Sequence, residues 1–91
     1  MTIADRLKQR RLQYGRDAGF EDGYLQEQIA AACGVGQPFY SLCENGYQRL
    51  PMFRMIMLAN FYGKPIEEAF PEFRPTPRER MLAGILREPA K

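Results

Sequence analysis

Apolar side chains recur at helical spacing along most of the chain, and short gaps that contain glycine separate the segments. Residues 25–33 place their apolar side chains on one side of a helix, which Gly34 can close in the left-handed conformation. Only two more residues separate this glycine from a second helical segment over 37–45. The inner face of that segment carries three apolar side chains, Phe39, Tyr40 and Cys43. Two short helices joined by a turn of three residues predict a helix-turn-helix.

The same periodicity predicts one helix before this pair and three helices after it. Thr2 can cap the first of these helices, and Asp5 lies in its first turn, near the positive end of the helix dipole. Gly15 would end that helix. The most apolar of the later helices starts at Pro51 and stops at Gly63. The four predicted helices cover residues 3–15, 51–63, 66–70 and 78–87.

Length and composition narrow the class of protein. Ninety-one residues form one domain with a modest core, without room for an added ligand-binding or protease module. The 13 basic and 11 acidic residues leave a net charge of only +2, so the overall charge is a poor argument for nucleic acid. Basic residues concentrate near the two ends of the chain, whereas residues 17–30 hold four acidic residues and no basic one. A basic end can meet phosphates, although an ordinary solvated surface has the same pattern.

No group of residues indicates catalysis or a bound cofactor. The sequence has no histidine, no glycine-rich phosphate loop and no nucleophile with a base at a recognisable spacing, so an enzyme is the least supported class. Cys33 and Cys43 lack the spacing of a metal site and fall on inner helix faces, which favours small buried thiols in a reduced compartment. No apolar run approaches the ~20 residues of a membrane span, and we expect no signal peptide before the domain. We therefore expect a cytoplasmic protein without catalytic residues, metal or cofactor.

The helix-turn-helix segment resembles that of phage repressor and Cro proteins, also called the xenobiotic-response-element family. Members carry a Gln early in the first helix of the pair, an Ala four residues later, a Gly in the turn and a closing Glu-Asn-Gly. The chain has these residues at Gln26, Ala30, Gly34 and 44–46. The resemblance covers roughly residues 3–70. It implies an all-α, lambda-repressor-like bundle of about five helices in residues 1–73. Beyond it, helical spacing of apolar residues predicts a C-terminal extension over 74–91 with a short amphipathic helix.

The resemblance also implies a sequence-specific DNA-binding regulator of transcription, with a small dimeric repressor on a palindromic operator as the favoured form. The recognition helix, 37–45, would enter the major groove. Its outer face carries no charge, and four side chains there would read bases: Gln37, Pro38, Ser41 and Leu42. A glutamine amide can bind adenine and an apolar side chain can meet a thymine methyl, so A·T pairs are expected. Phosphates would be contacted by residues before and after that helix: Arg10, Gln26, Asn45, Gly46, Tyr47, Gln48 and Arg49.

A structural ion pair follows from the same resemblance. Arg11 occupies the position that pairs with the glutamate of Glu-Asn-Gly, here Glu44. Such a pair would tie the first helix to the recognition helix. The alternative is an ordinary solvated arginine.

The chain departs from the family between residues 16 and 24, where the connection is longer than usual and acidic. Relatives have Ser or Thr as the cap of the next helix, but this chain has Leu25, which cannot cap. Asp22 is the nearest good capping residue. We therefore expect that helix to start a turn early, at Gly23.

Two apolar faces lack a partner within one copy of this fold. One is a stripe that recurs every four residues, Phe53, Met57 and Phe61. The other is the apolar face of the last helix, Met81, Leu82, Ile85 and Leu86. Packing one face on the other, within a subunit or across a two-fold axis, would remove both from water, and we expect a homodimer held by the C-terminal segment. The alternatives are a tail that folds back on its own domain, or one that binds a polymerase or a toxin, the latter in an antitoxin that represses its own promoter.

Overall fold

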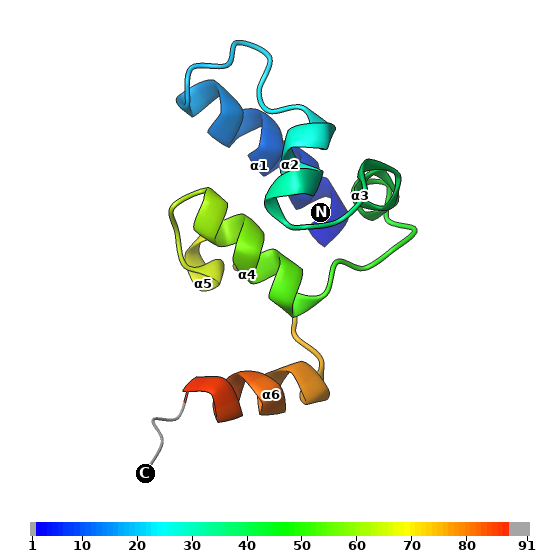
Figure 1. Cartoon of the computed structure of the whole chain (residues 1–91), viewed down its shortest axis with the longest axis vertical. Helices are drawn as coiled ribbons and strands as arrows, with labels where there is room; N and C mark the ends of the chain where they lie inside the picture. The colour runs from blue at the N-terminus through cyan, green and yellow to red at the C-terminus, as the bar shows by residue number, and fades with distance from the viewer. Residues whose placement is uncertain (1, 88–91) are drawn as a thin grey trace.

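Helices account for all regular secondary structure in residues 2–87, the part of the chain that the computed structural model describes (Figure 1). They are α1 (Ile3–Asp17), α2 (Gln26–Ala32), α3 (Gln37–Glu44), α4 (Met52–Phe61), α5 (Ile66–Ala69) and α6 (Pro77–Arg87). The predicted all-α class and the helix-turn-helix of α2 and α3 are confirmed. Two predicted dimer contacts, Ile85 and Leu86, have side chains outside the described residues. No described helix is long and apolar enough to cross a membrane.

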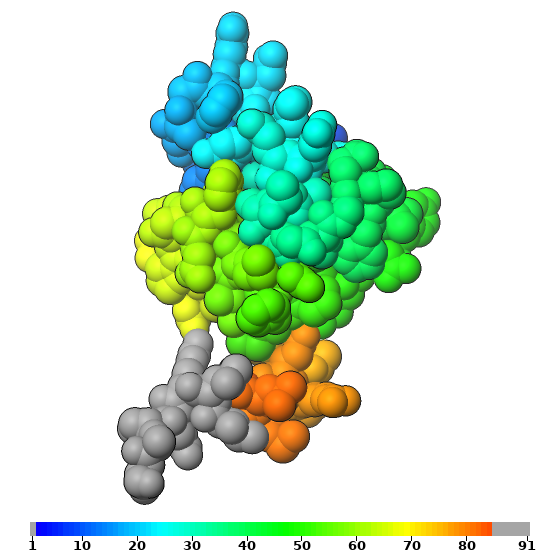
Figure 2. Space-filling view, viewed as in Figure 1, coloured from blue at the N-terminus to red at the C-terminus, as the bar shows by residue number. Residues whose placement is uncertain are grey.

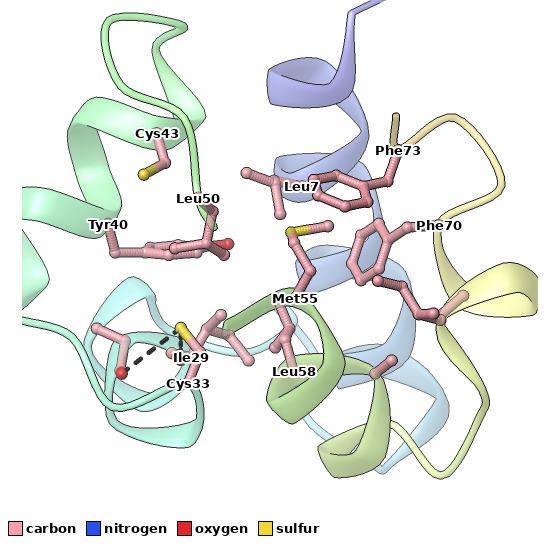
Figure 3. Close-up of a cluster of buried hydrophobic side chains, with 14 residues drawn as sticks. Leu7, Ile29, Cys33, Tyr40, Cys43, Leu50, Met55, Leu58, Phe70 and Phe73 are labelled. Atoms are coloured by element: carbon pink, nitrogen blue, oxygen red, sulfur yellow. Dashed lines mark hydrogen bonds between the residues drawn. The ribbon is translucent and has the colours of Figure 1, made fainter. Parts of the chain in front are cut away.

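One buried cluster joins the first five helices (Figure 3). α3 packs on α1 and α2, while α4 packs on α2 and α5. Met55 points from α4 toward Leu7 of α1 and the ring of Phe73. The largest fully buried side chains are Tyr40, Phe70, Ile29, Met55, Leu58, Cys33 and Cys43. The helix-turn-helix is thus held from behind by α1 and α4, which leaves the outer face of α3 exposed.

α1 is longer than its sequence pattern predicts. Thr2 caps it as predicted, because its Oγ1 accepts the N–H of Asp5 at 3.3 Å while the Asp5 carboxylate accepts the N–H of Thr2 at 3.0 Å. The helix does not end at Gly15, however, and continues to Asp17. Gly15 serves packing instead, since a Cβ there would lie 2.0 Å from the backbone nitrogen of Tyr24. Its missing side chain lets the following loop cross α1 closely.

The long connection between α1 and α2 is a loop, and the predicted early start of α2 on a carboxylate cap is wrong. Gly23 has a φ of +82° and lies against α1, where a Cβ would be 2.6 Å from the Cα of Leu12. This left-handed conformation prevents a helix from starting there. α2 begins at Gln26 instead, and Oε1 of Gln28 reaches back to accept the N–H of Leu25 at 2.8 Å.

α6 lies at one end of the molecule, beside the first turn of α4 (Figures 1 and 2). Thr76 and Glu79 cap its start reciprocally: Oγ1 of Thr76 accepts the N–H of Glu79 at 3.1 Å, and the Glu79 carboxylate accepts the N–H of Thr76 at 2.9 Å. The helix therefore begins at Pro77, one residue before its predicted start.

Candidate nucleic-acid interface

The outer face of α3 carries the four predicted base-reading side chains. Gly36 is the extended N-cap residue, and Pro38 falls within the first turn, where its missing N–H removes no helical hydrogen bond. Gln37, Pro38 and Leu42 are exposed, and Ser41 is half-buried. The face combines hydrogen-bonding and apolar groups without charge, so it suits base edges better than phosphates.

Behind this face, Arg11 of α1 and Glu44 of α3 form the predicted ion pair. Nε of Arg11 donates to Oε2 of Glu44 at 2.6 Å and Nη2 donates to Oε1 at 3.0 Å, so the pair is bidentate. Arg11 Nη1 also donates to the carbonyl oxygen of Tyr24 at 2.7 Å. Only 10% and 2% of the Arg11 and Glu44 side chains are exposed, so water and salt screen the pair little. Burial opposes the charge of Glu44, but hydrogen bonds from Arg11 and other neighbours outweigh it and hold the pKa of its carboxyl below the ordinary value.

Gln26 connects this pair to the first residue of the recognition helix. Its Nε2 donates to Oε1 of Glu44 at 3.1 Å, and its Oε1 accepts from Nε2 of Gln37 at 3.1 Å. The sequence predicted a phosphate contact for Gln26, but the structure places its amide between Glu44 and Gln37. A carboxylate only accepts hydrogen bonds, so Gln26 turns its NH₂ group toward Glu44 and its oxygen toward Gln37. Gln37 must then turn its own NH₂ group inward.

The Gln37 amide keeps the two groups that adenine requires. One of its N–H groups donates to Gln26. The second N–H and the carbonyl oxygen remain available for a hydrogen bond each. In the major groove, adenine presents an acceptor at N7 and a donor at N6, which complement these two groups. The hydrogen bond to Gln26 thus orients the Gln37 amide in the chain by itself.

The loop after α3 exposes most of the predicted phosphate-contacting residues. Asn45, Gly46, Tyr47 and Gln48 are all exposed, and the Tyr47 side chain is 78% exposed. Gly46 has a φ of +82°, and the N–H of Tyr47 returns to the carbonyl oxygen of Leu42 at 3.0 Å. This glycine closes α3 and directs the following residues outward.

Both predicted phosphate-contacting arginines have carboxylate partners within the chain. Nη2 of Arg10 lies 2.8 Å from Oε1 of Glu72, and only 17% of the Arg10 side chain is exposed. Arg49 contacts both oxygens of Glu79, at 2.6 and 2.9 Å, but 42% of its side chain remains exposed. Arg49 therefore stays exposed with the rest of the loop after α3, whereas the Arg10 side chain is largely covered.

The predicted apolar stripe on α4 is divided rather than continuous. Met57 is half-buried against the core, and the ring centroid of Phe61 lies 5.2 Å from that of Tyr24 in the loop before α2. Phe53 is 64% exposed. Phe53 and Leu82 line an apolar groove of about 330 Å³ between α4 and α6. The α4 and α6 faces thus meet in part within one copy of the chain.

Sequence reasoning missed the role of Glu79. Thr and Glu at positions 76 and 79 have the spacing of a capping box, which would have predicted the start of α6. The contact between Glu79 and Arg49, in contrast, joins residues 30 positions apart, and no local pattern signals it.

Both cysteines are buried and free, as their inner helix positions predicted. Burial raises the pKa of the Cys33 thiol to about 11, which keeps it protonated at neutral pH. Across residues 2–87, no cluster of His, Cys, Asp and Glu side chains could hold a metal ion.

Comparison with protein families gives an independent result. The family model described as helix-turn-helix matches residues 21–68, which run from the loop before α2 into α5. Comparisons with curated proteins and with solved structures gave no match. The match covers more than half of the chain and includes all of α2, α3 and α4. The chain therefore belongs to the helix-turn-helix family of the xenobiotic-response-element type, whose members are DNA-binding regulators of transcription.

Proposed function

We propose that this protein is a small repressor that binds a palindromic operator as a homodimer and reads bases with the outer face of α3. The observation that carries the proposal is the Gln37 amide, which Gln26 holds with one donor and one acceptor available. These two groups match adenine, and the neighbouring Pro38 and Leu42 side chains match a thymine methyl. A·T pairs are therefore expected in each half-site.

Phosphate contacts would come from the loop after α3. The five residues of this loop are exposed and follow the recognition helix directly: Asn45, Gly46, Tyr47, Gln48 and Arg49. Contacts of this kind fix the position of the protein on DNA without specifying sequence. Arg10 and Gln26 are left out of this set, because the Arg10 side chain is largely covered beside Glu72 and the Gln26 amide contacts both Glu44 and Gln37.

A second copy of the chain would supply the base contacts that one α3 lacks. Two linked copies that read half-sites about 34 Å apart multiply their contacts. The surface proposed for the second copy surrounds the groove between α4 and α6, where Phe53, Met81 and Leu82 are 64%, 60% and 46% exposed. In the sequence, Ile85 and Leu86 follow Met81 and Leu82 by four residues and extend the same helical face.

Selection of bound DNA from a random pool tests the operator. We expect a palindrome with A·T pairs in both halves and half-site centres about one helical turn (~34 Å) apart. A search for that site upstream of the protein's own gene would then identify autoregulation. A pool that yields no enriched sequence would contradict the proposal.

Sedimentation tests the dimer. Leu82→Asp places a charge in the proposed interface and should give a folded monomer that loses most of its affinity for the selected palindrome. Leu25→Asp is the control for oligomeric state, since it adds the same charge at another exposed leucine, outside the groove. A Leu82→Asp protein that stays dimeric would contradict this interface, and a monomeric wild-type chain that captures a toxic partner would favour an antitoxin.

A further inference from the structure

Arg49, in the loop after the recognition helix, contacts three residues from the C-terminal part of the chain, Phe73, Arg74 and Glu79. Glu79 accepts from Nη1 and Nη2 at 2.9 and 2.6 Å, and the carbonyl oxygen of Arg74 accepts from Nη2 at 3.1 Å. The guanidinium carbon lies 4.9 Å from the ring centroid of Phe73. All three partners lie beyond residues 21–68, the segment that the helix-turn-helix family model matches.

The Glu79 carboxylate also fixes the starts of two helices. Its Oε2 accepts the N–H of Met52, the first residue of α4, at 2.9 Å. α4 needs such a partner because its N-cap residue, Pro51, offers no side-chain cap. Oε1 accepts the N–H of Thr76 at the start of α6, also at 2.9 Å. One carboxylate therefore connects α4, α6 and the side chain of Arg49.

The geometry leaves Arg49 able to contact one more group. A guanidinium has five N–H donors, and three of those of Arg49 are used by Glu79 and Arg74. The others have no acceptor among the described residues, and 42% of the side chain is exposed. Figure 1 shows the loop leaving the end of α3 and entering the first turn of α4, with α6 beyond that turn. Arg49 thus belongs to the same exposed surface as the residues after α3.

We propose that Glu79 is a positioning residue for DNA binding: it holds Arg49 so that the remaining N–H groups of the guanidinium meet a phosphate beside the recognition helix. This inference rests on the proposed phosphate contact of Arg49. Fixing a long, flexible side chain in advance reduces the entropy lost on binding. The negative charge of Glu79 acts in the opposite direction, since it repels a phosphate. If positioning dominates, removing the charge of Glu79 weakens DNA binding. If repulsion dominates, removing it strengthens DNA binding.

The decisive comparison is between Glu79→Gln and Glu68→Gln, which change the net charge by the same amount. Glu68, on α5, has its Oε1 3.5 Å from Nζ of Lys64 and takes no part in the proposed contact. Affinity is measured for a random-sequence DNA duplex over a range of salt concentrations. Glu79→Gln should bind roughly two- to tenfold more weakly than the wild type, whereas Glu68→Gln should bind no more weakly. The slope of log affinity against log salt should fall by about 0.9 if one phosphate contact is lost.

Arg49→Gln provides the second variant. It should weaken binding at least as much as Glu79→Gln, and Glu79→Gln should cause no further loss of affinity in its background. Glutamine at position 79 can still complete the capping box, and thermal unfolding verifies that each variant is folded. Tighter binding by Glu79→Gln than by Glu68→Gln would overturn the proposal, as would an equal loss with and without Arg49. Because the duplex has random sequence, this result is independent of whether a palindromic operator or a dimer is found.

Discussion

Arg11–Glu44 and Arg49–Glu79 are two arginine–glutamate pairs with similar geometry and different surroundings. Each is bidentate, and the shortest contact in each is 2.6 Å. The side chains of Arg11 and Glu44 are only 10% and 2% exposed, whereas those of Arg49 and Glu79 are 42% and 18% exposed. Water and salt weaken an exposed pair far more than a buried one. Similar hydrogen bonds should therefore contribute unequally to stability.

The two pairs also support different parts of the candidate interface. Glu44 orients Gln26, and through it the Gln37 amide on the outer face of α3. Glu79 instead holds the loop after α3 and the first turn of α4. In our account, the buried pair supports base reading and the exposed pair supports phosphate contact.

The largest expected effect is the loss of one partner of the buried pair. Arg11→Ala or Glu44→Ala leaves the other charge uncompensated, and each should lower the free energy of unfolding by about 3–5 kcal/mol. The double variant should lose less free energy of unfolding than the two single variants lose when their losses are added. Urea denaturation of all four proteins gives the coupling energy, and strict additivity would contradict an interaction between the two side chains.

Acid should break the exposed pair within a defined pH range. Hydrogen bonds from Arg49 and two backbone N–H groups lower the pKa of Glu79 from an ordinary 4.5 to about 2. A carboxyl with a lower pKa in the folded chain stabilises the fold above its unfolded pKa, and this stabilisation is lost as the pH falls through the folded pKa. The free energy of unfolding should therefore decrease as the pH is lowered from 4.5 to about 2. In the Glu79→Gln variant, this free energy should decrease less steeply. Parallel urea-denaturation curves against pH for the two proteins would contradict this assignment.

The smallest expected effect is the coupling energy of the exposed pair at neutral pH. A double-mutant cycle with Arg49→Gln and Glu79→Gln should give under about 1 kcal/mol. This coupling should shrink as salt is added, while that of Arg11 with Glu44 should change little. If both couplings respond to salt alike, burial is not what distinguishes the pairs.

The local parts of the fold were predictable because their signals are local. Glycine at position 34, the buried Tyr40 and Cys43, and the Glu-Asn-Gly ending together specify α2, the turn and α3. The Arg11–Glu44 pair is not local, and it was predicted only from the resemblance to the family.

The rest depended on contacts between distant segments. Gly15 looked like the end of a helix, but its role is to let the backbone at Tyr24 cross α1. The partner of Arg10 is Glu72, 62 positions away, so nothing near either residue in the sequence signals their pairing. The partner of Arg49 lies in the extension beyond the segment that resembles the family. Local patterns identify a charged residue, but they do not identify which carboxylate will meet it.

The most direct test of base reading by α3 compares Gln37→Ala with Gln48→Ala on the selected operator and on random DNA. Both variants remove an exposed glutamine amide, one from the outer face of α3 and the other from the loop after it. Gln37→Ala should cost about 1–3 kcal/mol of binding free energy on the operator, with little loss on random DNA. Gln48→Ala should weaken binding to both DNAs by similar amounts. An equal loss on operator and random DNA for Gln37→Ala would contradict the assignment of base reading to the outer face of α3.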